Sequence, residues 1–210
     1  MKKVTKENKR IKIIEAAVKL FAKNGFEATS TRDICKLAGA NISLIAYYFG
    51  GKKELYDKII NSFAQQLDAQ MRIFINPDTD LDILSVKEKI DLIKLLIDKM
   101  MDYFYNSVSS YMIDILIKEQ QNPNTSISSP PYNFLRKILG SIFNQKPDSK
   151  EIVYKAVFIV SQIAFVRITP IFSLRVFGQA KFEPDDIIYI KNNLQLAIKA
   201  LFNEAGVNYE

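Results

Sequence analysis

Glycine and proline divide this chain into segments whose apolar residues recur at three- and four-residue steps, the spacing of one face of an α-helix. In the first segment Ile13, Ala17 and Phe21 follow this spacing, and Gly25 stands where a helix commonly ends. We find no internal repeat and no stretch that alternates apolar and polar residues as a half-buried strand would. The pattern therefore predicts an all-α fold.

The punctuation allows each helix to be assigned a range. The chain is expected to form about nine helices, over residues 5–24, 30–38, 41–48, 52–74, 86–105, 111–120, 131–143, 150–169 and 184–204. Residues 122–131, NPNTSISSPP, form the one low-complexity stretch and predict a loop. We expect a first domain over residues 1–51 and a second over 52–210, with the helix at 52–74 connecting them.

Composition removes several classes of site. The 210 residues include no histidine and one cysteine, Cys35, so we expect no metal, no cofactor and no disulfide within the chain. Cys35 itself is expected to be a small buried thiol. The basic N-terminus is not followed by an apolar signal core, which predicts a cytoplasmic protein. In the apolar run of residues 156–177, Arg167 and Pro170 favour a buried or subunit-facing helix over a membrane span.

Positive charge is concentrated at one end of the molecule. Residues 1–56 hold twelve Lys and Arg against five Asp and Glu, whereas the whole chain holds 29 and 23. Such asymmetry indicates a polyanionic partner for the first quarter of the chain. A solvated basic face without a partner would give the same count. An acidic membrane surface would require a long basic amphipathic helix with Trp or Phe.

Residues 30–49, STRDICKLAGANISLIAYYF, have the layout of two short helices joined by a tight turn at Gly39. Ser30 is expected to cap the first helix, with Asp33 as its partner three residues on, and Asn41 to cap the second. In such a helix-turn-helix the second helix enters the DNA major groove. A helical wheel places Ile45 and Phe49 on the buried side of that helix.

The opposite side of the second helix carries small and amphipathic residues that could contact DNA bases. A serine hydroxyl can bond base edges or phosphates, and apolar side chains can contact thymine methyl groups. These residues are Ser43, Leu44, Ala46 and Tyr47, with Ile42 at the edge. Packing against another part of the protein is the alternative for a helix that is apolar on both faces.

Cations and hydroxyls near helix starts predict phosphate contacts. Thr31 and Arg32 begin the first helix of the motif, where backbone N–H groups favour phosphate oxygens. Lys52 and Lys53 begin the following helix and oppose its dipole, which an external anion would relieve. The alternative is that both lysines are ordinary exposed side chains.

The continuous stretch of residues 11–56 resembles the DNA-binding domain of the TetR family of transcriptional regulators. It contains A-x-x-L-F-x-x-x-G-F at 17–26, S-x-R-D-I at 30–34, A-G at 38–39, Y-x-F at 47–49 and K-x-E-L at 52–55. The resemblance implies that bases are contacted by Arg32, Ile42, Ser43, Leu44, Ala46 and Tyr47. It implies phosphate contacts from Thr31, Tyr48 and Lys52. Tyr48 replaces a frequent His, and Gly51 replaces a better helix cap.

The family further implies a variable helical bundle that binds a small-molecule effector, and a homodimer that places two recognition helices on a palindromic operator. We expect the dimer to form through the helices at 150–169 and 184–204. The apolar stripe of the first is Ile152, Ala156, Ile159, Val160 and Ile163, and that of the second is Ile187, Ile190, Leu194, Ala197 and Leu201. The segment LIKEQQNP with the loop after it is similar to the CecR-like subgroup.

Aromatic and soft side chains in the second domain are the natural lining of an effector cavity, although most such clusters are plain core. The candidate ligand-binding residues are Met100, Phe104, Tyr111, Phe134, Phe158, Gln162, Phe165 and Arg167. Arg167 needs a partner in its apolar helix, which could be an acidic side chain, a helix C-terminus or an anionic ligand. The loop around Pro130 is the expected entrance.

These features favour a ligand-responsive repressor. A DNA-binding protein that needs no small ligand would share the same basic domain. An enzyme is disfavoured, because no carboxylate pair at catalytic spacing, nucleophile motif or phosphate loop occurs.

Overall fold

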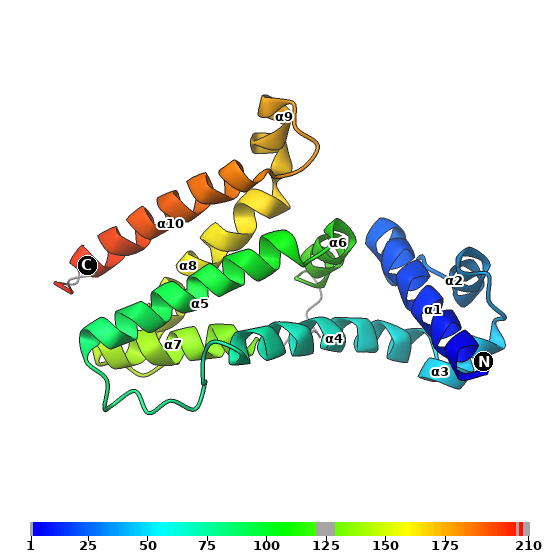
Figure 1. The fold of residues 1–210 in the computed structure, drawn as a ribbon, viewed down its shortest axis with the longest axis horizontal. Coiled ribbons are helices and arrows are strands. Elements are labelled where there is room, and N and C mark those ends of the chain that lie inside the picture. The colour runs from blue at the N-terminus through cyan, green and yellow to red at the C-terminus, as the bar shows by residue number, and fades with distance from the viewer. Residues whose placement is uncertain (1, 121–128, 205, 208–210) are drawn as a thin grey trace. The chain divides into compact units, whose positions relative to one another are not determined.

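A computed structural model describes residues 2–120, 129–204 and 206–207, and all regular structure in these ranges is helical (Figure 1). The predicted all-α fold is therefore confirmed. Most of the predicted loop, residues 122–128, lies outside the described residues. The elements are α1 (Lys2–Asn24), α2 (Thr31–Ala38), α3 (Ser43–Phe49), α4 (Lys52–Arg72), α5 (Val86–Asn106), α6 (Ser110–Glu119), α7 (Pro130–Phe143), α8 (Lys150–Ile168), the 3₁₀ helix η1 (Pro170–Phe172), α9 (Leu174–Phe177) and α10 (Pro184–Glu204).

The described residues divide into two compact units. One draws on Met1–Gln66 and Val108–Ser128, and the other on Leu67–Ser107 and Ser129–Glu210. Helix α4 contributes residues to both units, and α6 belongs to the first unit although it follows α5 in the chain. The domain boundary expected after residue 51 was drawn where the sequence motif ends, whereas the first compact unit continues to Gln66 and includes α6. That boundary stays a prediction.

The first unit is built around the buried face of α1. Ile13, Ala17 and Phe21 recur every four residues and are at most 1% exposed. The Phe21 ring meets the Tyr56 ring of α4 edge-on, with 4.9 Å between their centroids. The centroid of the Phe26 ring lies 5.0 Å from that of Tyr56. Helices α2 and α6 both pack against α1, and α3 contacts it as well. Helix α1 is thus the support on which the helix-turn-helix rests.

The second unit has a core shared by four helices. Ile93 of α5, Leu135 of α7, Ile159 of α8 and Ile198 of α10 are all fully buried. Helix α5 contacts α7, α8 and α10, and α8 contacts α7 and α10 (Figure 1). Aliphatic side chains of this number and burial supply the main stabilisation of the unit.

A charged cluster also ties α10 to α5. Lys191 Nζ donates to Asp98 Oδ1 at 2.6 Å and to Asp102 Oδ1 at 2.8 Å. Partial burial alone would lower the pKa of Lys191, but the hydrogen bonds to the two carboxylates raise it above its ordinary value. Lys191 therefore stays charged and joins the two helices.

One stretch departs from the expected nine helices. Between Pro170 and Gly178, where the sequence predicts only an interruption, the chain forms η1 and the single turn α9. Gly178 ends α9 in the left-handed region at φ 67°. A four-residue turn is too short for apolar periodicity to reveal. Among the described residues no single helix is long and apolar enough to cross a membrane; α8 and Pro170–Phe177 meet that test only together, with a 74° bend between them.

Candidate functional site

Short-range capping sets the bounds of α2. The Ser30 hydroxyl accepts from the Asp33 backbone N–H at 3.1 Å and donates to the Asp33 carboxylate at 2.5 Å. Gly39 closes the helix with φ 58°, a conformation that side-chain-bearing residues rarely adopt. Thr31 is half-buried and Arg32 is exposed in the first turn of this helix. Arg32 therefore projects into solvent from a firmly held backbone.

The turn into α3 is held by Asn41. Its side-chain oxygen accepts from the backbone N–H of Ser43 at 3.0 Å and from the Ser43 hydroxyl at 2.9 Å. The helix begins at Ser43 instead of next to Asn41, because Asn41 forms a side-chain turn that spans Ile42. Ile45 is 2% exposed and anchors α3 to the unit. The buried thiol of Cys35 contacts the Asn41 carbonyl at 3.6 Å, and burial raises its pKa.

The predicted base-contacting residues of α3 share its outward side. Ile42 is 47% exposed and Tyr47 is 67% exposed, and Ser43 and Ala46 are also exposed. Leu44 and Tyr48 are half-buried, and the two tyrosine rings meet edge-on at 5.0 Å. Four of these residues, Ile42, Ser43, Ala46 and Tyr47, are thus exposed on α3, as is expected of a groove-reading helix. Their roles remain predictions.

Lys52 and Lys53 have partners within the protein. Lys52 Nζ donates to the carbonyl of Phe26 at 2.9 Å and lies 4.2 Å from the Phe26 ring centroid. Lys53 Nζ pairs with Asp57 at 2.6 Å. These contacts relieve part of the unfavourable positive charge at the start of α4. The two lysines therefore have less need of an external anion than the sequence predicts. Lys52 remains the better candidate, since carbonyl oxygens do not neutralise its charge.

Helix α6 supplies contacts that sequence analysis did not anticipate. Tyr56 of α4 donates its hydroxyl to Glu119 at 2.5 Å, and both residues are 8% exposed. Lys118 donates to the Ala22 carbonyl and, at 3.4 Å, to the Lys23 carbonyl, which caps the end of α1. Each partner lies more than sixty residues away in the chain. No local signal could have shown these contacts.

The predicted ligand residues do not form one cluster. Met100 and Phe134 are buried in the core of the second unit. Phe158, Gln162 and Phe165 are exposed on α8, and Tyr111 of α6 is 45% exposed and belongs to the first unit. Within the second unit, Phe104 and Arg167 are joined by a contact described below.

Arg167 packs on two aromatic rings. Its guanidinium carbon lies 5.3 Å from the Phe104 ring centroid and 5.8 Å from that of Tyr105. Partial burial lowers the pKa of Arg167. Tyr105 donates its hydroxyl to the Ile163 carbonyl at 3.2 Å and meets Phe182 edge-on at 5.3 Å. Burial raises the pKa of Tyr105 to about 12. Aromatic rings are not among the three kinds of partner that the sequence left open for Arg167.

The two helices expected to form the dimer turn a different face outward from the one predicted. On α8, Ile152, Ala156, Ile159 and Ile163 are at most 3% exposed, and Val160 packs against the same core. On α10, Leu194 is 3% exposed, and Ile187, Ile190 and Leu201 pack against this core as well. The assignment of these stripes to the dimer face was therefore wrong. Helical periodicity identifies an apolar face but not what covers it. The outward face of α8 is apolar too. It borders an open depression lined by Glu151, Tyr154, Lys155, Val157, Phe158, Ser161 and Leu201.

Among the described residues, no group of three or more His, Cys, Asp or Glu side chains is arranged to hold a metal ion. The site is therefore best described as a surface of exposed polar, aromatic and basic side chains around α3. Such a surface can bind a partner and discriminate between partners by hydrogen bonds and apolar contacts.

Comparison with known proteins agrees with this description. Residues 13–59 match the family model described as bacterial regulatory proteins, tetR family. The HTH-type transcriptional regulator YttP of Bacillus subtilis is 48% identical over 52 residues, which are 25% of this chain and 25% of YttP. The dual regulator CecR of Shigella flexneri is 37% identical over 82 residues, 35% of this chain and 36% of CecR. These matches span only about a quarter to a third of the relatives' length. Membership of a CecR-like subgroup stays a prediction.

Solved structures extend the likeness in fold to most of the chain. A transcriptional regulator from Saccharomonospora viridis in complex with choline has a TM-score of 0.57 and 15% identity, covering 92% of this chain and 96% of that one. A transcriptional regulator from Aquifex aeolicus VF5 has a TM-score of 0.51 and 15% identity over 93% and 99%. At such identity the likeness shows the fold alone. The relatives named here are transcriptional regulators and not enzymes, in agreement with the sequence analysis.

Proposed function

We propose that this chain, whose residues 13–59 match the family model of bacterial regulatory proteins, tetR family, is a dimeric repressor. It leaves a palindromic operator when a small apolar molecule binds its C-terminal helices. The observation that carries the DNA-binding part is the surface of α3, where Ser43 and Tyr47 are exposed while Ile45 anchors the helix from behind. A helix held in this way can enter the major groove without rearrangement.

Specific roles follow from position on this surface. We assign base contacts to Arg32, Ile42, Ser43, Leu44, Ala46 and Tyr47, and phosphate contacts to Thr31, Tyr48 and Lys52. Among the residues assigned to base contacts, Arg32 and Tyr47 are the best to substitute. Both are exposed, and both have side chains long enough to reach base edges. Lys52 is held by a carbonyl at 2.9 Å, which orients its ammonium group at the start of α4.

The test begins with selection of bound duplexes from random DNA, followed by affinity measurements on the selected site and on a scrambled one. Arg32→Ala and Tyr47→Ala should reduce the preference for the selected site by roughly 5- to 150-fold, the equivalent of about 1–3 kcal/mol. Lys52→Ala should weaken both duplexes alike. Equal losses on both duplexes for Arg32→Ala and Tyr47→Ala would contradict the assigned base contacts.

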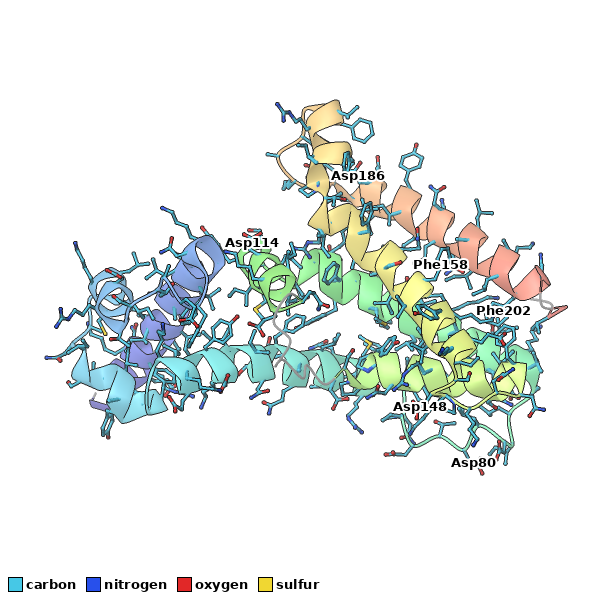
Figure 2. All side chains as sticks on the ribbon, turned by 180° about the vertical axis from the view of Figure 1, so that it is seen from behind. Asp80, Asp114, Asp148, Phe158, Asp186 and Phe202 are labelled. Atoms are coloured by element: carbon cyan, nitrogen blue, oxygen red, sulfur yellow. The ribbon has the colours of Figure 1, made fainter. Side chains whose placement is uncertain are left out.

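The dimer is proposed to form through the outward faces of α8 and α10. Figure 2 marks Phe158 on α8 and Phe202 on α10; Phe158 is 45% exposed, whereas Phe202 is fully buried. The exposed apolar residues of the two helices are Tyr154, Val157, Phe158, Phe165, Ile168, Ile188, Tyr189 and Leu196. Apolar residues exposed in such number on two adjacent helices are typical of an interaction surface. A footprint without two-fold symmetry would contradict this arrangement.

Release by an effector is proposed because α4 contributes residues to both compact units. A ligand bound among α5, α7 and α8 would bias α4 at one end, and the DNA-binding helices would respond at the other. Of the lining expected from the sequence, the proposed site keeps Phe104 and Arg167, which contact each other within the second unit. Operator affinity with and without hydrophobic compounds, in the wild type and in Phe104→Ala, tests it. A coupling of about 1–3 kcal/mol would weaken operator binding roughly 5- to 150-fold.

A DNA-binding protein that needs no effector is the second candidate. It is favoured by the exposure of Phe158, Gln162 and Phe165, since three of the lining residues expected from the sequence face solvent in this protomer. A compound that binds the second unit and leaves operator affinity unchanged would support this candidate and refute release.

A further inference from the structure

The positive charge of the first quarter of the chain lies mostly outside the helix-turn-helix. Residues 2–12 contain six Lys and Arg and one acidic residue, Glu7. Residues 13–29 contain two basic and two acidic residues, and residues 30–56 contain four basic and two acidic residues. The motif that is proposed to read bases is therefore only weakly basic, and the segment of residues 2–12, here called the basic segment, carries most of the excess.

The basic segment belongs to α1 and is attached to the helix-turn-helix by two contacts. Lys9 Nζ donates to the carbonyl of Gly39, in the turn between α2 and α3, at 2.7 Å. The Arg10 guanidinium lies 6.0 Å from the ring centroid of Phe49, the last residue of α3. Lys9 thus lies at the turn that precedes α3, and Arg10 lies near the last residue of α3.

Residues 7–12 of the basic segment do not contribute to the buried core of the first unit. All six are exposed or half-buried, and Ile13 is the first buried residue of α1 among those whose burial is described. The first turn of α1 has no acidic residue, so its lysines oppose the helix dipole. A helical start of this kind gains stability from an external anion.

We propose that the basic segment binds the phosphates of the DNA that flanks the bases read by α3, and that it supplies most of the salt-dependent affinity without reading sequence. The inference rests on the proposed function, since it assumes that α3 enters a DNA groove. Lys9 and Arg10 hold the segment in place, and Lys2, Lys3, Lys6 and Lys12 provide charge for phosphates.

DNA fits this charge better than an anionic lipid surface does. A helix that lies in a membrane interface needs a broad apolar face, commonly with Trp, Phe or Leu. The basic segment, KKVTKENKRIK, has Val4 and Ile11 as its only large apolar residues and no aromatic residue. A regular array of phosphates on a duplex requires cations and no apolar face.

The experiment compares two full-length variants with the same change in charge. In the first, Lys2, Lys3, Lys6 and Lys12 become Gln, which leaves Lys9 and Arg10 untouched. In the matched control, four exposed lysines of the second unit become Gln: Lys87, Lys137, Lys146 and Lys181. Affinity for the selected operator and for a scrambled duplex is measured across a range of salt concentrations.

For the first variant, the slope of log affinity against log salt should become shallower by about 0.9 for each phosphate that is no longer neutralised, or about 2–4 in total. Both duplexes should lose affinity by the same factor, so the preference for the operator should not change. The control should keep the wild-type slope. Circular dichroism establishes that the helices remain, and a variant with Arg at the same four positions should restore the slope.

An unchanged slope in the first variant, or an equal loss in the control, would overturn the inference while leaving the proposed function standing. A reduced preference for the operator would also overturn it, because the segment would then read bases. If the first variant no longer bound phosphatidylglycerol vesicles but kept the wild-type salt slope for DNA, the basic segment would bind a lipid surface instead. If the wild-type protein bound the operator and the scrambled duplex equally well, the proposed function itself would be refuted.

Discussion

Replacing Tyr56 with Phe removes one hydroxyl from the buried centre of the first unit and leaves the ring in place. The hydroxyl donates to Glu119 at 2.5 Å, and both residues are 8% exposed. The edge contacts of the ring with Phe21 and Phe26 do not involve the hydroxyl. Burial and the hydrogen bond to Glu119 raise the pKa of Tyr56, so the hydroxyl stays protonated and can donate at neutral pH.

The expected effect is large for a single atom. A hydrogen bond to a charged group contributes about 1.5–3 kcal/mol, and removal of the donor leaves a desolvated carboxylate less well satisfied. We therefore expect Tyr56→Phe to lower the free energy of unfolding by about 1.5–3 kcal/mol. The exposed Tyr154 is the control, since Tyr154→Phe should change stability by less than about 0.5 kcal/mol.

The assay is a double-mutant cycle in urea with Tyr56→Phe, Glu119→Leu and the double variant, followed by circular dichroism. Hydrogen exchange of α6 amides localises the effect, because the two compact units need not unfold together. A coupling energy below about 0.5 kcal/mol would refute the reasoning that this bond fastens α6 to α4.

Three further outcomes follow from other parts of the structure. Gly39→Ala should lower the free energy of unfolding by about 1–2 kcal/mol, because φ is 58° there, whereas Gly39→Asn should cost less in the same urea titration. Burial raises the pKa of Tyr105 to about 12, so the folded state holds its proton more tightly than the unfolded state does. The stability that this provides should be complete below about pH 10 and lost toward pH 12. Tyr105→Phe should therefore lose less stability than the wild type between pH 10 and pH 12 in urea denaturation. Phe158→Glu should give a monomer by sedimentation at micromolar concentration, whereas Phe177→Glu, an exposed residue outside the proposed dimer helices, should not.

Local signals explain why much of the fold could be predicted from the sequence. The start of α2 depends on Ser30 and Asp33 and its end on Gly39, all within ten residues of one another, so the capping interactions can be read in order along the chain. The same holds for α5, where Ser85 and Glu88 form a capping box. The direction in which Ile45 faces also follows from helical spacing alone.

Features that depend on distant partners could not be predicted. The contacts of Lys52 with Phe26 and of Tyr56 with Glu119 bridge 26 and 63 residues, and neither leaves a trace in periodicity. The dimer face of α8 was misassigned because that helix is apolar on both sides. In such a helix, spacing does not identify which face the core will cover.

The position of α6 bears directly on how release could work. Helix α6 follows α5 after a connection of only three residues, in which Ser107 caps the end of α5 and Ser109 caps the start of α6. We propose that a displacement of α5 by an effector is passed along this short connection to α6. Helix α6 is fastened in turn to α4 through Tyr56 and to the end of α1 through Lys118. If release uses this route, Tyr56→Phe should reduce the effect of an effector on operator affinity as well as stability. An unchanged effector response in a destabilised Tyr56→Phe protein would instead leave α4 as the route between effector and operator.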